Sequence, residues 1–160
     1  MNKKKLIINF SATRKFEEAD YDLKTVIRNA AKLTLIRENF PYDAEISVTL
    51  CDNEYIHGLN KRYRGVDKHT DVLSFPIYEN GEFDECECIG GAMLGDIVIS
   101  LERAREQAEE IGNTFFEEVA FLTIHSMLHL LGYDHERGKE DEELQCRIQK
   151  EIMTELKGDL

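Results

Sequence analysis

An α+β fold is predicted by three features of the sequence, and residues 1–160 are expected to form one domain around one core. The stretch EISVTLC, residues 45–51, alternates apolar and polar side chains, as a half-buried strand does. The stretch DLKTVIRNAAKLTLIREN, residues 22–39, carries apolar side chains at the spacing of one helix face. Strands and helices follow one another without an internal repeat, which favours a small mixed sheet with two or more helices on one side.

The first half of the chain is expected to hold three strands and two helices. Residues 4–10 form the first strand, residues 22–39 an amphipathic helix, and residues 45–51 the second strand. Asp52 can cap a short helix that carries Leu59 and Tyr63. Residues 70–76, TDVLSFP, form a third strand that ends at Pro76.

The second half is expected to add one strand and three helices. Residues 77–93, IYENGEFDECECIGGAM, are rich in glycine and acid, which is typical of a mobile loop. Residues 94–100 form the fourth strand. Ser100 caps a helix over residues 101–112, and Thr114 with Glu117 forms a capping box for a helix that runs to Leu131. A final helix over residues 144–156 packs one face inward.

The overall charge limits the partners of the protein. With 20 basic and 32 acidic residues, the formal charge is -12, which opposes non-specific binding to nucleic acid and to anionic membranes. Any polyanion must therefore meet a local basic patch. No stretch approaches the roughly 18 apolar residues of a membrane span, and the apolar run near the N-terminus is too short for a signal peptide. The four cysteines are scattered, so a reduced, cytoplasmic setting is expected.

Three of the five histidines lie in the stretch HSMLHLLGYDH, residues 125–135. His125 and His129 are about one helical turn apart, so both imidazoles can reach one ion. Gly132 can end the helix in the left-handed conformation, which lets the chain fold back and bring His135 to the same ion. Three histidines and an open fourth position, which holds a water, predict one catalytic Zn²⁺ per chain. A hydrogen-bonded histidine pair in the core is the alternative.

The residue after the first histidine limits the chemistry. The spacing resembles that of metzincin peptidases, which carry a glutamate base directly after the first histidine. This chain has Ser126 there, and a serine hydroxyl cannot take a proton from zinc-bound water at useful rates. A metallopeptidase is therefore a minor alternative. Asp134 is either an acceptor that fixes a histidine tautomer or a solvated loop carboxylate.

A basic patch lies upstream of the third strand. Lys61, Arg62, Arg64 and Lys68 accompany one acid, Asp67, which gives four positive charges against one negative. A planar guanidinium can hold two phosphate oxygens at once, so this patch can bind a phosphate. The alternative is a solvated helix end, whose positive charges complement the helix dipole.

Three stretches in their order resemble the motifs of the YbeY family of bacterial endoribonucleases and ribosomal RNA maturation factors. They are LNKRYRGVDKHTDVLSFP, LGDIVIS and HSMLHLLGYDH, and the resemblance runs from Leu6 to the last helix. It implies a zincin-like α+β fold, with a mixed four-stranded sheet and about five helices. It also implies that the third strand, around residues 71–75, lies on an edge beside the metal cleft.

The resemblance assigns roles to individual residues. The three zinc ligands of the family fall on His125, His129 and His135. The functionally important arginine falls on Arg64, and His125 is the ligand most often tied to activity, so these two are the expected catalytic residues. Ser126 stands where the family most often has glycine, and should fit. His69 replaces a common proline, as either a neutral change in a loop or an added polar group in the cleft.

The implied activity is that of a zinc-dependent, single-strand-specific endoribonuclease in ribosomal RNA processing, at the 3′ end of 16S rRNA, and in ribosome quality control. The implied partners are single-stranded or ribosomal RNA and the small ribosomal subunit with its associated factors. A ribosome assembly factor with a mainly structural zinc is a further alternative, although an open ligand position argues against a closed structural site. The sequence identifies no general acid or base, no attacking nucleophile and no oligomeric state.

Overall fold

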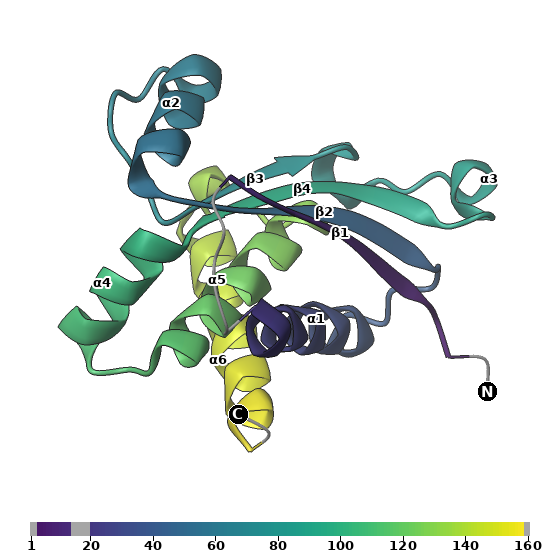
Figure 1. Ribbon diagram of the computed structural model, residues 1–160. Helices are drawn as coiled ribbons and strands as arrows, with labels where there is room; N and C mark the ends of the chain where they lie inside the picture. The colour runs from purple at the N-terminus through teal and green to yellow at the C-terminus, as the bar shows by residue number, and fades with distance from the viewer. Residues whose placement is uncertain (1–2, 14–19, 159–160) are drawn as a thin grey trace.

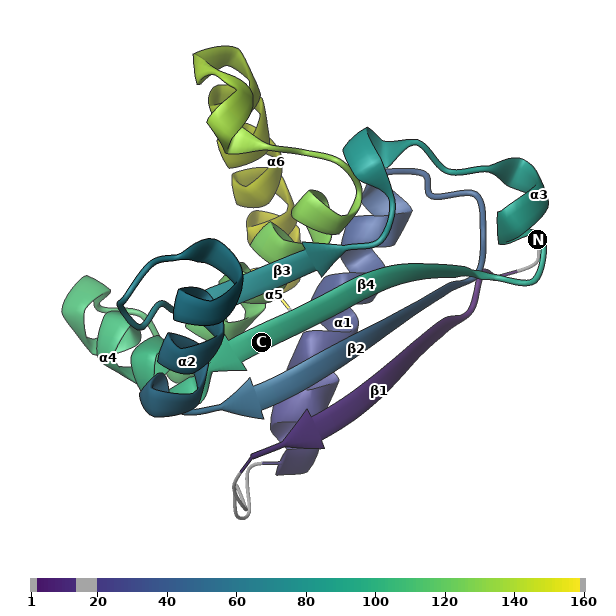
Figure 2. The same ribbon diagram turned by 90° about the horizontal axis from the view of Figure 1, so that it is seen from above.

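A four-stranded sheet forms the centre of the computed structural model, which describes residues 3–13 and 20–158 without the side chains of Asp20, Tyr21 and His135. The strands are β1 (Leu6–Ala12), β2 (Ala44–Cys51), β3 (Val72–Pro76) and β4 (Ala92–Ser100), in the order β1-β2-β4-β3. β1, β2 and β4 are parallel, and β3 pairs with β4 in the antiparallel sense. β1 and β3 are therefore the two edges (Figure 2), and the predicted mixed sheet is confirmed.

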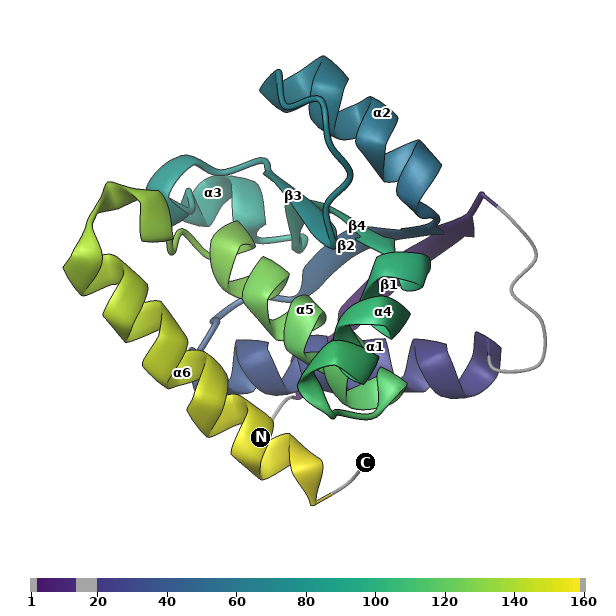
Figure 3. The same cartoon turned by 90° about the vertical axis from the view of Figure 1, so that its left-hand side faces the viewer.

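The described residues form six α-helices, one more than the approximate number predicted. They are α1 (Asp20–Arg37), α2 (Asn53–Arg64), α3 (Glu85–Cys88), α4 (Leu101–Ile111), α5 (Phe115–Leu130) and α6 (Lys139–Lys157), with 3₁₀ turns η1 (Glu79–Gly81) and η2 (His135–Arg137). Four helices, α1, α4, α5 and α6, lie on one side of the sheet, whereas α2 stands on the other side (Figures 1 and 3). The predicted α+β class is confirmed.

Helix α5 lies between two apolar layers. One face packs on the sheet, where Met127 belongs to the same buried cluster as Ile46 and Ile97. The opposite face packs on α1 and α6, where Ile124 belongs to a second cluster with Ile152. Because interiors are close-packed, a helix held on both sides has little freedom to shift. Polar side chains on α5 are therefore presented at fixed positions.

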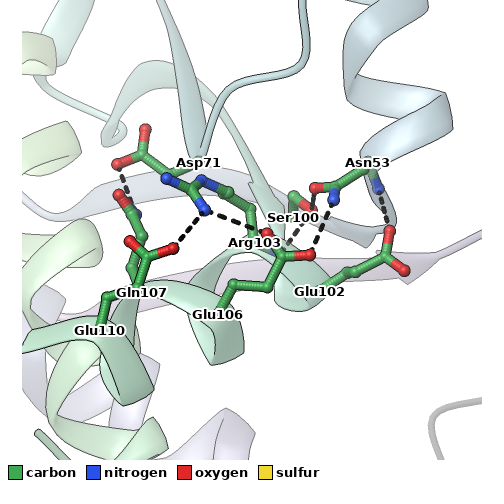
Figure 4. A network of polar contacts seen from close by, with 8 residues as sticks. All are labelled: Asn53, Asp71, Ser100, Glu102, Arg103, Glu106, Gln107 and Glu110. Carbon is green, nitrogen blue, oxygen red and sulfur yellow. Dashed lines mark hydrogen bonds and ion pairs between the residues drawn. The ribbon is translucent and has the colours of Figure 1, made fainter. Parts of the chain in front are cut away.

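A network of polar contacts fixes the start of α2 (Figure 4). The Ser100 hydroxyl at the end of β4 donates to Asn53 Oδ1 over 2.8 Å, and the backbone N–H of Asn53 donates to Glu102 Oε1 over 3.1 Å. In the same region Gln107 Nε2 donates to Asp71 Oδ2 over 3.0 Å, which ties α4 to the start of β3. The start of α2 and the start of β3 are thereby both tied to the end of β4 and to α4.

Several boundaries differ from the prediction. β1 starts and ends two residues later than expected, and β4 begins at Ala92 rather than at residue 94. The segment predicted as a mobile loop, residues 77–93, contains η1 and α3, and Asp84 caps α3 by accepting from the Cys86 amide over 2.8 Å. α6 begins at Lys139, because acidic side chains in its first turn complement the helix dipole. None of the described helices is long and apolar enough to span a bilayer.

Candidate metal centre

Helix α5 brings His125 and His129 together. Thr114 caps the helix by accepting from the Glu117 amide over 3.1 Å, as predicted, and the helix continues to Leu130. The two Nε2 atoms are 3.1 Å apart, the ring centroids are 4.6 Å apart, and the ring planes are inclined by 70°. The imidazoles therefore direct the same ring nitrogen at one point between them.

The donor set fits a zinc ion. Two nitrogens bound to one tetrahedral zinc at about 2.0–2.1 Å are separated by about 3.3 Å. The Nε2 atoms of His125 and His129 lie close to that separation. The same distance also suits a hydrogen bond between two neutral rings when no ion is bound. Neutral imidazoles are among the commonest ligands of zinc, so these two residues can hold the metal that the spacing predicts.

Gln149 holds the far side of the His125 ring. Its amide nitrogen lies 3.1 Å from His125 Nδ1, and its side chain, on α6, is 4% exposed. The amide can donate to a bare Nδ1 or, after a half-turn, accept from an Nδ1–H group. The second arrangement leaves a lone pair on Nε2, the nitrogen that faces His129. Gln149 can therefore fix the ring in the tautomer that binds a metal.

A tight turn at Gly132 follows α5. The φ angle of Gly132 is 107°, and a Cβ there would lie 2.5 Å from the Gly81 nitrogen. Only glycine fits both the left-handed backbone and this approach of η1. Arg137 donates a hydrogen bond to the Gly132 carbonyl. Burial and a hydrogen bond with Glu38 raise the pKa of the next residue, Tyr133, to about 12, so its phenol stays protonated.

The turn leads directly to His135, the first residue of η2. Asp134 caps η2, since its Oδ1 accepts from the Glu136 amide over 2.9 Å. The carboxylate of Asp134 thus shapes the turn that carries His135. The side chain of His135 lies outside the described residues, and among the side chains that are described no group of three forms a metal site. The third ligand stays a prediction.

A cavity of about 240 Å³ lies in front of the histidine pair. Its walls come from β3, the end of α2, helix α5 and the turn before η2, and β3 is an edge strand, as the resemblance implied. The lining residues are Arg64, Val72, Leu73, Ser74, Pro76, His125, His129, Asp134 and Glu136. The two expected catalytic residues, Arg64 and His125, therefore share one cavity although they are far apart in the sequence.

Arg64 is the last residue of α2, and its position follows from local structure. Gly65 ends the helix in the left-handed conformation, with φ 69°, and its amide donates to the carbonyls of Asn60 and Lys61. Arg64 Nη2 lies 3.4 Å from Glu136 Oε1, and the two side chains are 50% and 67% exposed. The guanidinium is thus half open to solvent and paired with a carboxylate that a phosphate would have to displace.

Other predicted residues lie outside the cavity. Ser126 is fully buried, does not line the cavity, and its hydroxyl has no hydrogen-bond partner among the described residues. His69 is exposed and does not line the cavity. Arg62 lies over the Tyr63 ring, 5.3 Å from its centroid. Of the four cations in the basic patch, only Arg64 lines the histidine cavity.

Two residues of the site were missed by the sequence reasoning. Gln149 could have been noticed, because Gln145 and Gln149 are polar residues four apart beside the apolar stripe of α6, and both are buried. Glu136 gave no signal, because many acidic residues precede α6 in the sequence. Both belong to segments that meet α5 or α2 only in the folded protein.

Comparison with known proteins gives consistent results. A family model described as endoribonuclease YbeY matches residues 8–157. A protein of Caldanaerobacter subterraneus subsp. tengcongensis, named endoribonuclease YbeY, is 50% identical over 139 residues, which cover 84% of this chain and 87% of the relative. A Bacillus subtilis protein of the same name is 47% identical over 130 residues, 79% of this chain and 82% of the relative.

A solved structure supports the same assignment. The solution structure of a Thermotoga maritima protein matches with a TM-score of 0.56 and 29% sequence identity, and the match covers 96% of this chain and 93% of the other. The residues that the family model matches include both histidines of α5 and Arg64. The chain therefore belongs to the YbeY endoribonuclease family.

Proposed function

We propose that this protein is a zinc-dependent endoribonuclease that cleaves single-stranded RNA. We further propose that it acts in ribosomal RNA processing, at the 3′ end of 16S rRNA, and in ribosome quality control with the small ribosomal subunit. The names of its relatives support the reaction. One structural observation carries the proposal for this chain: a half-exposed arginine and two converging imidazoles line the same cavity.

Each residue has a defined task in this proposal. His125 and His129, with His135, hold the metal, and Gln149 keeps the His125 ring in the metal-binding tautomer. When bound, zinc supplies Lewis-acid polarisation and lowers the pKa of a water molecule towards 7. Arg64 binds the phosphate and stabilises the negative charge that develops during cleavage. Before RNA binds, the carboxylate of Glu136 forms an ion pair with the Arg64 guanidinium.

The surroundings of Ser126 disfavour a peptidase. Its hydroxyl is buried and points to no partner among the described residues, so it cannot serve as a base at the cavity. The cavity in front of the histidines also disfavours a purely structural zinc, which is usually closed by four protein ligands. The family match over residues 8–157 supports one catalytic domain over residues 1–160, and four free cysteines suit the proposed cytoplasmic setting.

Three proteins test this proposal: wild type, His125→Ala and Arg64→Ala. Each is assayed on a single-stranded ribosomal RNA fragment and on an unstructured peptide, and the zinc content of each is measured. We expect His125→Ala to lose both the metal and RNA cleavage. Arg64→Ala should keep its zinc and lose about 10²–10³ in the rate of RNA cleavage, the usual cost of removing a group that stabilises developing charge.

Arg62→Ala is the matched control, because Arg62 belongs to the same basic patch but does not line the cavity. It should cleave RNA nearly as fast as wild type. The proposal fails if Arg64→Ala keeps full activity, and the metal assignment fails if His125→Ala retains its zinc. Cleavage of the peptide by wild type would favour the peptidase.

A further inference from the structure

A second cavity lies at the other edge of the sheet. Its volume is about 570 Å³, more than that of the histidine cavity, and it lies between the start of β1 and the last turns of α1. Its lining combines apolar side chains with lysines: Lys3, Lys4, Lys5, Leu6, Lys32, Leu35, Ile36, Asn39, Phe40 and Tyr42. None of these residues belongs to the site described above.

The charge around this cavity is opposite in sign to that of the whole protein. The four lysines are exposed, and none of them forms an ion pair with the residues that the structure describes. Acidic groups also lie at this end: Asp43 Oδ1 accepts from the backbone amide of Lys5 over 2.7 Å, and burial together with nearby Glu85 and Asp84 raises the pKa of Tyr42. In a chain of formal charge -12, four ammonium groups around one cavity form a local attractor for anions.

The positive charge continues along α1. Lys24, Arg28 and Lys32 follow one another at four-residue steps, about 6 Å apart along the helix. Arg28 donates to the Leu6 carbonyl over 3.3 Å, and Lys24 lies 5.5 Å from the centroid of the Phe10 ring, so both cations lie against β1. We call the six residues Lys3, Lys4, Lys5, Lys24, Arg28 and Lys32 the basic seam.

The shape of the basic seam selects among anions. A ligand with a single carboxylate needs only one or two of these cations, whereas three cations along two turns of α1 and three more before β1 suit a chain of charges. The floor of the cavity offers the half-buried rings of Phe40 and Tyr42, which lie edge to face with centroids 5.7 Å apart. Regularly spaced cations beside aromatic rings are typical of surfaces that bind single-stranded nucleic acid.

We propose that the basic seam is a second RNA-binding site, which holds a part of the strand that flanks the cleavage point. Phosphates contact the lysines, and a base enters the cavity against Phe40 and Tyr42. The proposal rests on the function proposed above, because that function supplies the single-stranded RNA. Since β1 and β3 are opposite edges of the sheet (Figure 2), a short RNA cannot occupy both sites at once, whereas a longer one can.

The test compares two double variants with equal net charge. Lys4→Gln/Lys32→Gln removes two cations of the basic seam, and Lys139→Gln/Lys150→Gln removes two exposed cations of α6. Binding and cleavage are measured on unstructured RNAs of about 4 and about 20 nucleotides over a range of salt concentrations. For the seam variant on the long RNA, we expect weaker binding and a salt slope reduced by about 1.4, from two lost phosphate contacts.

Kinetics separate this site from the catalytic one. The seam variant should raise KM for the long RNA, with kcat unchanged and cleavage of the short RNA unaltered, whereas the α6 variant should match wild type. An unchanged salt slope and KM for the seam variant would overturn the proposal. The proposal would also be overturned if the seam variant bound RNA as wild type does but no longer bound vesicles of phosphatidylglycerol. That result would assign the basic seam to a membrane surface.

The two proposals can fail separately. If wild type binds the long RNA through the seam lysines but does not cleave it, the seam stands and the endoribonuclease function falls. If wild type cleaves RNA and the seam variant binds with the same salt slope as wild type, the function stands and the seam falls.

Discussion

The two edges of the sheet differ in how their polar side chains are held. At the β3 edge, His125 lies on a helix that is packed on both faces, and the buried Gln149 holds its ring. At the β1 edge, the lysines of the basic seam are exposed and form no ion pair with the described residues, although Lys24 lies over the Phe10 ring. A few oriented groups can bind a metal and direct a reaction, whereas many mobile charges supply affinity that depends on salt.

This contrast predicts different responses to substitution. Changes to the histidines of α5 and to the side chains that support them should alter metal affinity or stability and leave the salt dependence of RNA binding intact, whereas changes at Arg64 or Glu136 should alter one phosphate contact. Changes at the β1 edge should alter affinity and salt dependence and leave the metal intact. Four substitutions at and around the β3 edge test this contrast, in order of decreasing effect.

The largest effect is expected for Gln149→Ala. Loss of the amide frees the His125 ring, and removal of a group that orients a metal ligand typically lowers metal affinity by about 10–100-fold. Competition with a chromogenic chelator measures the metal affinity. Gln149→Glu should retain most of the wild-type affinity, because a carboxylate can also accept a hydrogen bond from Nδ1–H of His125.

Gln145→Ala is the control for Gln149→Ala. Gln145 lies one turn earlier on α6 and is 1% exposed, but neither atom of its amide has a hydrogen-bond partner in the described part of the chain. Its truncation should leave zinc affinity near that of wild type. Equal losses for the two variants would mean that α6 acts through packing alone.

Gly132→Ala should reduce stability. The new methyl group meets the backbone of Gly81 and adopts an unfavourable φ, which costs about 1–3 kcal/mol in the free energy of unfolding. Urea denaturation measures the loss. A Gly58→Ala control should not destabilise, because a Cβ there meets no atom within 4 Å and alanine favours a helix. Salt-dependent RNA binding should be the same for both variants if the two edges are independent.

Glu118→Gln should change the response of stability to pH. Burial raises the pKa of the Glu118 carboxyl above 4.5, nearby Asp71 raises it further, and a hydrogen bond with Asn113 opposes the shift. Because the folded protein holds this proton more tightly than the unfolded chain does, the protonated carboxyl contributes to stability at pH values below its pKa in the unfolded chain. That contribution is lost as the pH rises through the pKa of the carboxyl in the folded protein. The glutamine variant should therefore be more stable than wild type at pH 7, by thermal unfolding, and lose this advantage in acid.

Glu117→Gln is the matched control with the opposite sign. A hydrogen bond with Thr114 lowers the pKa of Glu117, so its carboxylate stabilises the fold above the unfolded pKa and loses that effect as pH falls. The control should be less stable than wild type at neutral pH. Identical pH profiles for the two variants would contradict this account of the buried charge.

The smallest effect is expected for Glu136→Gln. An exposed ion pair contributes about 0–1 kcal/mol, so freeing Arg64 should strengthen RNA binding by no more than about fivefold. Fluorescence anisotropy with a short RNA measures the affinity of each variant. Asp141→Asn, which removes a carboxylate near Arg137 and away from the histidine cavity, should have no such effect.

The sequence predicted the fold and the closeness of the two α5 histidines because both depend on local spacing. Alternation identified β2, and a four-residue step placed His125 and His129 on one face of α5. Short elements were missed because α3 is a helix of four residues, too short to show periodicity. Its only signal was Asp84, a capping residue in a segment already crowded with acid.

Contacts between distant segments could not be predicted. Nothing in the sequence pairs Gln149 with His125, or Lys32 with the N-terminal lysines, because these contacts arise only when helices pack on each other and on the sheet. Arg64 was placed with the histidines by family resemblance, and the cavity lining agrees with that placement. The side chain of His135 stays untested.

The contact between Gln149 and His125 also bears on when the site is completed during synthesis. The ribosome makes Arg64 early, the α5 histidines late and Gln149 near the end, and folding during synthesis follows the order of emergence. A nascent chain that already contains the sheet and α5 therefore still lacks the side chain that contacts the His125 ring. An unfinished chain cannot present the complete centre to RNA on the ribosome that is producing it.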